Sequence, residues 1–143
     1  MSVAKVMVHT DVILDHLYGT KHPSVLRQAM STFFCYTSVF QAVEVFAVAL
    51  SPRERKAAEE AMSAMKLLGL NPKYAMRYGD LFAAHPRLHP NVLLVAGLCL
   101  ESRLPVLTGR TKEFKGIRGL TLIPTRYVGK GMSGSDIVNA LQR

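Results

Sequence analysis

The feature that most constrains this chain is an abrupt change from apolar to polar residues near its N-terminus. Val6–Val8 is a short apolar run of the kind that a strand buried on both faces requires. His9–Asp11 follows directly, and Ile13–Leu17 then has the apolar spacing of a helix. In open α/β sheets, functional sites lie beyond the carboxyl ends of the strands. His9–Asp11 therefore contains the first candidate site residues.

The rest of the chain alternates short apolar runs with helical patterns. Further strands are predicted at 33–36, 104–107 and 120–123. Helices are predicted over 12–17, from Pro23, from the capping boxes at Ser38 and Ser51, from Asn71, and from Asn91 as N-cap to about Arg103. The helix from Ser51 is expected to reach Leu68 and to end at Gly69. Strands that alternate with helices imply right-handed crossovers, so the predicted fold class is α/β with a central parallel sheet.

The length of 143 residues fits one domain, which we assign to 1–143 with a core of about 5–124 and a C-terminal tail at 125–143. No apolar run approaches the ~20 residues needed to span a bilayer, and the N-terminus lacks the layout of a signal peptide. Cys35 and Cys99 are far apart in apolar surroundings, which favours free thiols in a reducing compartment. We therefore expect a cytoplasmic protein without a membrane segment.

The net charge of +8 and the pI near 9.8 favour anionic partners, either nucleic acid or an acidic protein. A basic surface that is merely solvated is the alternative. The distribution favours a partner, because the segment 103–130 has one acid, Glu113, among many bases. These bases are Arg103, Arg110, Lys112, Lys115, Arg118, Arg126 and Lys130.

The run from His9 to Asp15 resembles the opening of a PIN domain, the fold of VapC-type toxins and related metal-dependent ribonucleases. In that family the first strand commonly ends in Asp-Thr, followed by Asp, Asn or Ser and an apolar run. Thr10 and Asp11 match this pattern. The family's first metal-binding Asp falls on His9.

Three further segments resemble the same family in the correct order, and together they extend the resemblance from about Val6 to Ile123. The stretch 90–96 resembles Pro-x-Asp-x-Leu-Ile-Ala, and 104–114 resembles a strand that ends in Thr-Arg-Asn or Thr-x-Asp with Lys-Asp-Phe beyond. The stretch 116–120 matches the approach to the last strand. The resemblance implies a three-layer α/β/α sandwich with a central parallel sheet, and a homodimer.

Family members gather acids around Mg²⁺ or Mn²⁺, hard cations that take oxygen ligands and activate water. The helix from Ser38 places Glu44 at the family's acidic Glu, although a solvent-facing Glu44 is an equal alternative by pattern alone. The helix Asp of the family falls on Val92, and its last Asp or Asn falls on Arg110. Val92 offers no ligand atom, and Arg110 adds a permanent cation.

We therefore expect no bound metal, and a Glu44–Arg110 ion pair in its place. Should a metal bind, Asp11, Glu44 and His9 are its expected ligands, with His9 favouring a softer ion such as Zn²⁺ or Mn²⁺. The family-site positions His9, Thr10, Asp11, Glu44, Val92 and Arg110 are predicted to converge on one cleft.

The resulting prediction is a PIN-like protein, catalytically impaired, that binds RNA or a partner protein through a basic cleft. The predicted nucleic-acid-binding residues are Arg110, Lys112, Lys115 and Arg118. The alternative is an active Mg²⁺-dependent VapC-type ribonuclease toxin, with Asp11 and Glu44 as catalytic remnants and Asp15 or Asp80 recruited. A third class is an interaction protein, either a homodimer or a toxin-like protein whose basic groove holds an acidic antitoxin segment.

Overall fold

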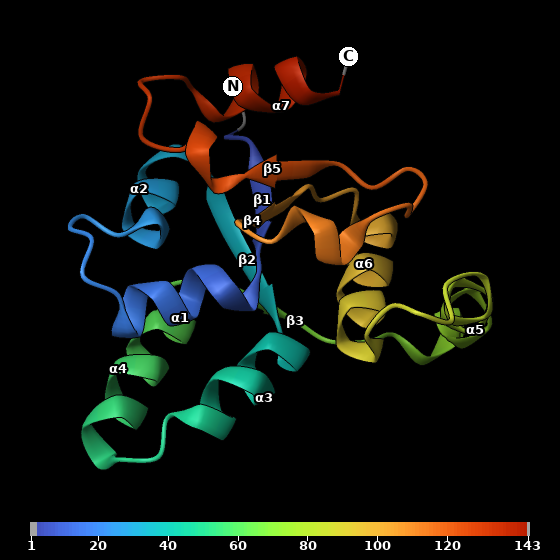
Figure 1. The fold of residues 1–143 in the computed structure, drawn as a ribbon, viewed down its shortest axis with the longest axis horizontal. Coiled ribbons are helices and arrows are strands. Elements are labelled where there is room, and N and C mark those ends of the chain that lie inside the picture. The colour runs from blue at the N-terminus through green and yellow to red at the C-terminus, as the bar shows by residue number, and fades with distance from the viewer. Residues whose placement is uncertain (1–2, 143) are drawn as a thin grey trace.

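The computed structural model describes residues 3–142, which form a parallel sheet with helices on both faces (Figure 1). The strands are β1 (Lys5–Val8), β2 (Phe34–Ser38), β3 (Lys66–Leu68), β4 (Val106–Thr108) and β5 (Leu122–Pro124). The α-helices are α1 (Thr10–Tyr18), α2 (Val25–Thr32), α3 (Val39–Val48), α4 (Pro52–Ser63), α5 (Ala75–Ala84), α6 (Pro90–Ser102) and α7 (Gly134–Leu141). Short 3₁₀ turns are η1 (Pro72–Tyr74), η2 (Thr111–Phe114) and η3 (Thr125–Tyr127).

The five strands lie in the order β3-β2-β1-β4-β5, and every neighbouring pair is parallel. β1 is the central strand: Val6 pairs with Cys35 of β2, and Met7 pairs with Val106 of β4. The apolar run that follows Lys5 is therefore buried between neighbours on both sides. The predicted central parallel sheet is confirmed.

The alternation of side chains along β1 divides the core into two layers. Val6 and Val8 pack against apolar residues of α1, α2 and α4 on one face of the sheet. Met7 points to the other face and packs against α6. In Figure 1, α1, α2 and α4 lie on one side of the sheet, and α5 and α6 lie on the other. The arrangement is the three-layer α/β/α sandwich that the resemblance implied.

Several helix boundaries differ from the sequence prediction. The helix expected from Pro23 begins at Val25, because the Ser24 side chain caps it. The helix expected from Asn71 is the 3₁₀ turn η1, and α5 follows it. The helix expected to run from Ser51 to Leu68 ends at Ser63, and Lys66–Leu68 forms the edge strand β3 instead. Its pairing with Tyr36–Ser38 of β2 decides this conformation, because a long-range partner overrides local helical pattern. The helix expected to be capped by Asn91 starts at Pro90, whose fixed φ and missing N–H suit the first helical position.

The C-terminal segment beyond residue 124 contributes to the core. It contains the short helix α7, whose N-cap Ser133 accepts a hydrogen bond from the backbone N–H of Asp136. Ile137 of α7 and Val128 before it are buried in the same core layer as Val6. Within residues 3–142, no helix combines the length and apolar character needed to span a bilayer.

Candidate functional site: a cleft at the carboxyl ends of β1 and β4

The residues predicted to converge come from four separate elements and line two adjoining hollows. His9 after β1, Glu44 of α3, Val92 of α6 and Arg110 after β4 line a hollow of about 430 Å³. The second hollow, of about 390 Å³, shares His9, Glu44 and Arg110 with the first and adds Asp11 with Thr10. We call the two hollows together the cleft. The structure thus brings the six predicted family-site positions together.

Asp11 ties the first turn of α1 to the loop after β4. Its Oδ1 accepts a hydrogen bond from Thr108 Oγ1 at 2.9 Å, and its Oδ2 accepts one from the backbone N–H of Gly109 at 2.7 Å. A Cβ at Gly109 would lie 3.2 Å from Asp11 Oδ2, so the absence of a side chain there permits the close approach. Both carboxylate oxygens of Asp11 therefore have partners within the protein.

Glu44 faces the cleft, which decides between the two orientations that its pattern allowed. The residue is half-buried, and its Oε1 accepts a hydrogen bond of 2.7 Å from Thr10 Oγ1. The helix that positions it begins as predicted, because the Ser38 side chain accepts a hydrogen bond from the backbone N–H of Gln41. The hydrogen bond from Thr10 to the Glu44 carboxylate is charge-assisted, which makes it one of the stronger kinds, and it fixes the Glu44 rotamer.

Arg110 does not form the predicted ion pair with Glu44. Its Nη1 lies 3.5 Å from Glu113 Oε1, an acid three residues further along the same turn. The backbone N–H of Arg110 donates to Thr108 Oγ1 at 2.9 Å. The local pair is favoured because it orders only one short turn, whereas a pair with Glu44 would span the cleft.

His9 is buried in the floor of the cleft, with 5% of its surface exposed. Its Nε2 lies 3.7 Å from Glu113 Oε2, its ring meets Phe114 edge-on at 4.9 Å, and its buried Nδ1 has no hydrogen-bond partner. Burial lowers the pKa of His9 below 6.5, although the charges of Asp11, Glu113 and Glu44 act in the opposite direction. Burial of the ring therefore favours its neutral form.

A family model for the PIN domain matches residues 6–119 of the sequence. The chain belongs to the PIN domain family. No curated protein matches the chain.

The solved structures that are similar to this chain include VapBC complexes. The chain is similar to VapBC2 of Rickettsia felis bound to a promoter DNA fragment, with 20% identity, a TM-score of 0.69, and 82% of this chain and 96% of that chain covered. It is similar to DNA-bound VapBC of Salmonella typhimurium, with 20% identity and a TM-score of 0.71, and to VapBC-1 of Haemophilus influenzae, with 19% identity and a TM-score of 0.72. Each of these two matches covers 85% of this chain and 98% of the other chain. At these identities, the likeness concerns the fold.

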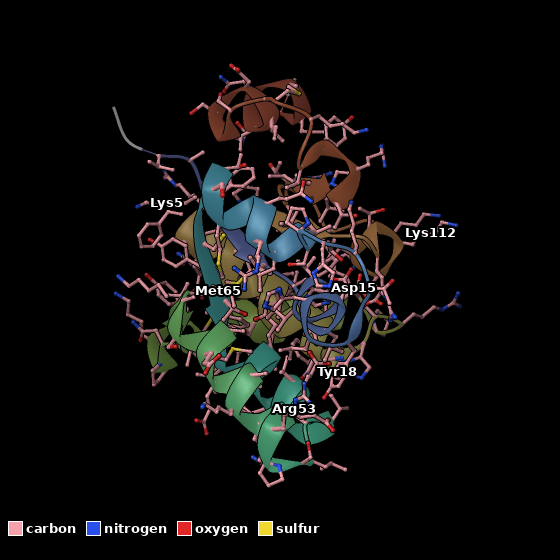
Figure 2. The ribbon with its side chains drawn as sticks, turned by 90° about the vertical axis from the view of Figure 1, so that its left-hand side faces the viewer. Lys5, Asp15, Tyr18, Arg53, Met65 and Lys112 are labelled. Carbon is pink, nitrogen blue, oxygen red and sulfur yellow. The ribbon has the colours of Figure 1, made fainter. Side chains whose placement is uncertain are left out.

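The PIN-domain cleft is less basic than the sequence suggested. Its lining has four carboxylates, from Asp11, Asp15, Glu44 and Glu113, and two guanidinium groups, from Arg87 and Arg110. The other predicted nucleic-acid-binding residues, Lys112, Lys115 and Arg118, are exposed but line neither hollow. Figure 2 shows Lys112 at the outer edge of the molecule, pointing away from it. These three cations thus lie outside the lining of the cleft, whereas Arg110 and Arg87 line it.

Sequence reasoning missed Glu113, Arg87 and His89 as lining residues of this PIN-domain cleft. Glu113 was available from the resemblance, because Lys112-Glu113-Phe114 corresponds to the family's Lys-Asp-Phe. Arg87 and His89 lie in the loop before α6, and no motif distinguishes them there. Asp80 lines neither hollow, so it is not placed to assist Asp11 and Glu44.

Mg²⁺ and Mn²⁺ take several oxygen ligands in close geometry, and the family-site positions of this PIN domain supply such ligands only in part, from Asp11 and Glu44. Asp11 has both oxygens bonded to the β4 loop, and Val92 contributes only methyl groups. Arg110 brings a permanent positive charge to the lining. Within residues 3–142, no three His, Cys, Asp or Glu side chains are grouped so that they could hold a metal ion.

Proposed function

We propose that this PIN domain binds RNA along Arg110 and the exposed cations that follow it in the sequence, without the metal-dependent hydrolysis that its family resemblance implies. The observation that carries the proposal is Arg110, a guanidinium group that lines both hollows at a family acid position. A divalent cation entering there would be repelled by this charge, although solvent weakens the repulsion because the Arg110 side chain is 70% exposed. A phosphate group would be attracted by the same charge.

The segment that follows β4 supports binding of a polyanion. Arg110, Lys112, Lys115 and Arg118 are all exposed within nine residues of chain, and Arg87 faces the same cleft from the loop before α6. An extended strand of RNA can contact several such cations at once, and each contact releases counterions. The carboxylates that line the second hollow repel phosphate groups. We therefore expect the phosphates of a bound RNA at the exposed cations outside this hollow and not deep within it.

Fluorescence anisotropy with a labelled single-stranded RNA tests this proposal, in EDTA and over a range of salt concentrations. We expect tight binding without Mg²⁺ and a steep loss of affinity with salt. The double substitution Lys112→Ala, Lys115→Ala should flatten the slope of log K against log salt by roughly 2, about 1 for each lost phosphate contact. The matched control is Arg55→Ala, Lys56→Ala, which removes two exposed cations from α4.

Two results would contradict the proposal. An unchanged salt slope in the Lys112, Lys115 variant would mean that these side chains are only a solvated face. Strong Mg²⁺-dependent cleavage by the parent protein, abolished by Glu44→Gln, would establish the active ribonuclease alternative instead.

A second candidate is binding of an acidic, antitoxin-like protein segment, and a separate groove favours it. This groove of about 690 Å³ lies among α1, α2 and α4; its lining combines Arg27 and Arg53 with the apolar Met30 and Ala61. Figure 2 faces this side of the molecule, with Arg53 labelled near the start of α4. The similar VapBC structures are toxin–antitoxin complexes. Binding of an acidic peptide that Arg27→Ala, Arg53→Ala weakens, with RNA binding absent, would establish this candidate.

We also propose that the chain forms a homodimer through an exposed apolar face on α3 and β3. Val43 is 61% exposed, Leu67 is 48% exposed and Val39 is 43% exposed. β3 is an edge strand whose outer side has no paired neighbour in residues 3–142. Sedimentation equilibrium should give a dimer mass for the parent protein and a monomer mass for Val43→Glu, since a charge in an apolar interface is costly.

A further inference from the structure

We propose that a hollow between α5 and α6 binds a small aliphatic amine, whose ammonium group forms hydrogen bonds with Glu101 and Tyr78 while its hydrocarbon chain lies against apolar side chains. This α5–α6 hollow has a volume of about 440 Å³, within the range of small-ligand sites. Both helices lie on the face of the sheet opposite α1 (Figure 1). Among the described residues, none lines both this hollow and the cleft, so the inference does not depend on RNA binding.

Two buried polar atoms from residues that line the α5–α6 hollow lack a hydrogen-bond partner. They are Oη of Tyr78 on α5 and Oε1 of Glu101 on α6, and neither has a partner within residues 3–142. Tyr78 is only 6% exposed. Buried polar atoms without partners destabilise a fold and are rare in proteins. Two of them on facing helices, both from the lining of one hollow, indicate a site for a ligand that bonds to both.

The Tyr78 ring is held against α6, next to the turn that carries Glu101. A Cβ at Gly97 would overlap this ring, so the glycine permits the close approach. Gly97 and Glu101 are one helical turn apart on α6 and therefore share a face. Burial raises the pKa of Tyr78, and the nearby negative charge of Glu101 raises it further. The phenol thus stays protonated near neutral pH, and its oxygen can accept a hydrogen bond from an ammonium group.

The charged groups of this lining favour a cation. Asp80 and Glu101 contribute carboxylates, and neither forms an ion pair within residues 3–142. Arg77 contributes a guanidinium group, which lies 5.2 Å from the centre of the Tyr74 ring in a cation–π contact. Tyr74 is outside the lining of the hollow. The guanidinium is thus engaged with that ring, and the two carboxylates attract a positively charged ligand although the chain has a net charge of +8.

The rest of the lining is apolar and suits a hydrocarbon chain. It consists of Leu81 and Ala84 on α5, and Gly97 and Leu100 on α6. Leu100 is 36% exposed, so a ligand chain would remove apolar surface from water. An ammonium group has three donors, enough for Glu101 and Tyr78 together, whereas an alcohol has one. A carboxylate ligand would be repelled by the two acids. An aliphatic amine therefore matches both the polar and the apolar parts of the hollow.

Isothermal titration calorimetry of the full chain with hexylammonium chloride tests the proposal, at constant ionic strength in an amine-free buffer. We expect a Kd below about 1 mM, and binding of hexanoate and of 1-hexanol that is weaker by about 10-fold or more. Glu101→Gln keeps the size of the side chain and removes its charge, so it should weaken hexylammonium binding by about 10-fold. The matched control is Glu59→Gln, which removes an exposed acid from α4 and should bind as the parent does.

The substitution Tyr78→Phe separates ligand binding from a purely structural role of the hydroxyl. Because Oη is buried without a partner, its removal should raise the Tm of the amine-free protein by about 2–4 °C. The same variant should bind hexylammonium about 3–10-fold more weakly, because it loses one neutral acceptor. A lower Tm in Tyr78→Phe would mean that the hydroxyl is bonded within the protein, and it would overturn the proposal.

Two further results would overturn the proposal. Equal affinities for hexylammonium, hexanoate and 1-hexanol would show that the hollow selects only apolar chains; this comparison needs no variant and stays valid if Glu101→Gln fails to fold. Loss of hexylammonium binding in Glu44→Gln, with binding retained in Glu101→Gln, would place the amine at the carboxylates of the cleft instead.

Discussion

Restoring the missing acids should convert the cleft into a metal site. The triple substitution His9→Asp, Val92→Asp, Arg110→Asp places carboxylates at the three family positions that lack them, beside Glu44 and Asp11. It also removes the guanidinium group that repels a divalent ion. We expect the variant to bind Mg²⁺ at millimolar concentration, and the parent protein not to do so.

The three changes differ in their cost without metal. Val92 is 4% exposed, and loss of its burial costs about 1.5–3 kcal/mol before the desolvation of the new carboxylate is counted. His9 is 5% exposed, so its replacement by Asp also buries a charge. Arg110 is 70% exposed at its side chain, and loss of its ion pair costs about 0–1 kcal/mol. In EDTA the triple variant should lose a substantial share of the ~5–15 kcal/mol by which such a domain is stable.

Thermal unfolding with and without Mg²⁺ measures the recovery. A site with a Kd of about 1 mM gains RT ln(1 + [L]/Kd), roughly 1.4 kcal/mol, at about 10 mM Mg²⁺. For a chain of this size the gain corresponds to about 3–6 °C in Tm. The parent protein should shift by less than about 1 °C, because it has little differential affinity for the ion. If the triple variant is unfolded, the double variant that keeps Val92 tests the same expectation.

The matched control for the charge change is Arg118→Asp, which alters an exposed arginine that lines neither hollow. Equal Mg²⁺ responses of Arg118→Asp and Arg110→Asp would show that net charge, and not the cleft, governs the effect. A parent protein that gains as much from Mg²⁺ as the triple variant would refute the reasoning outright, because Asp11 and Glu44 would then suffice.

Two further predictions concern stability. Burial holds the pKa of His9 in the folded state below its usual 6.5. The stability that depends on the neutral ring is therefore fully present above pH 6.5, and the free energy of unfolding falls as the pH falls, by at most about 1.4 kcal/mol per pH unit. The pKa of His16 is lowered too, so it also makes stability fall at low pH. Denaturant unfolding between pH 7 and 5 should therefore show a smaller loss of stability for His9→Asn than for the parent, and His16 should account for a part that remains. A Cβ at Gly97 would overlap the buried ring of Tyr78, so Gly97→Ala should cost about 1–3 kcal/mol. Gly79→Ala, with nothing within 4 Å of the new Cβ, should be neutral or stabilising by up to about 1 kcal/mol; equal effects at both sites would contradict this packing argument.

The local elements of this fold are encoded by residues close together in the sequence, which explains why most were predictable. The apolar run of β1, the cap at Ser38 and the proline at the start of α4 act over a few residues. β3 was not predictable in this way. Lys66–Leu68 is a strand because Tyr36–Ser38 lies beside it, and neither the helical pattern before it nor Gly69 after it carries that information.

The site shows the same division. The resemblance located the segments that meet at the cleft, but not the directions of their side chains. Arg110 was expected to reach Glu44 across the cleft, and it turns to Glu113 three residues away. Thr10, which the resemblance placed only as a matching residue, donates the hydrogen bond that orients Glu44. Rotamers depend on neighbours brought together by the fold, so the roles of these side chains depend on distances that the sequence does not contain.

Glu113 illustrates why charge counting misreads such a site. Along the sequence it is one acid among seven bases, and it lowers the net positive charge of a segment whose charge suits polyanions. In the folded chain it lies between the buried ring of His9 and the exposed guanidinium of Arg110. Substituting it would make the segment more basic and, by charge alone, a better ligand for RNA. By geometry, the substitution removes the negative charge that lies 3.5 Å from Arg110 Nη1 and 3.7 Å from His9 Nε2. A Glu113→Gln protein that binds RNA more tightly than the parent would show that total charge governs the attraction, and one that binds RNA less tightly would show that the local placement of Arg110 matters more.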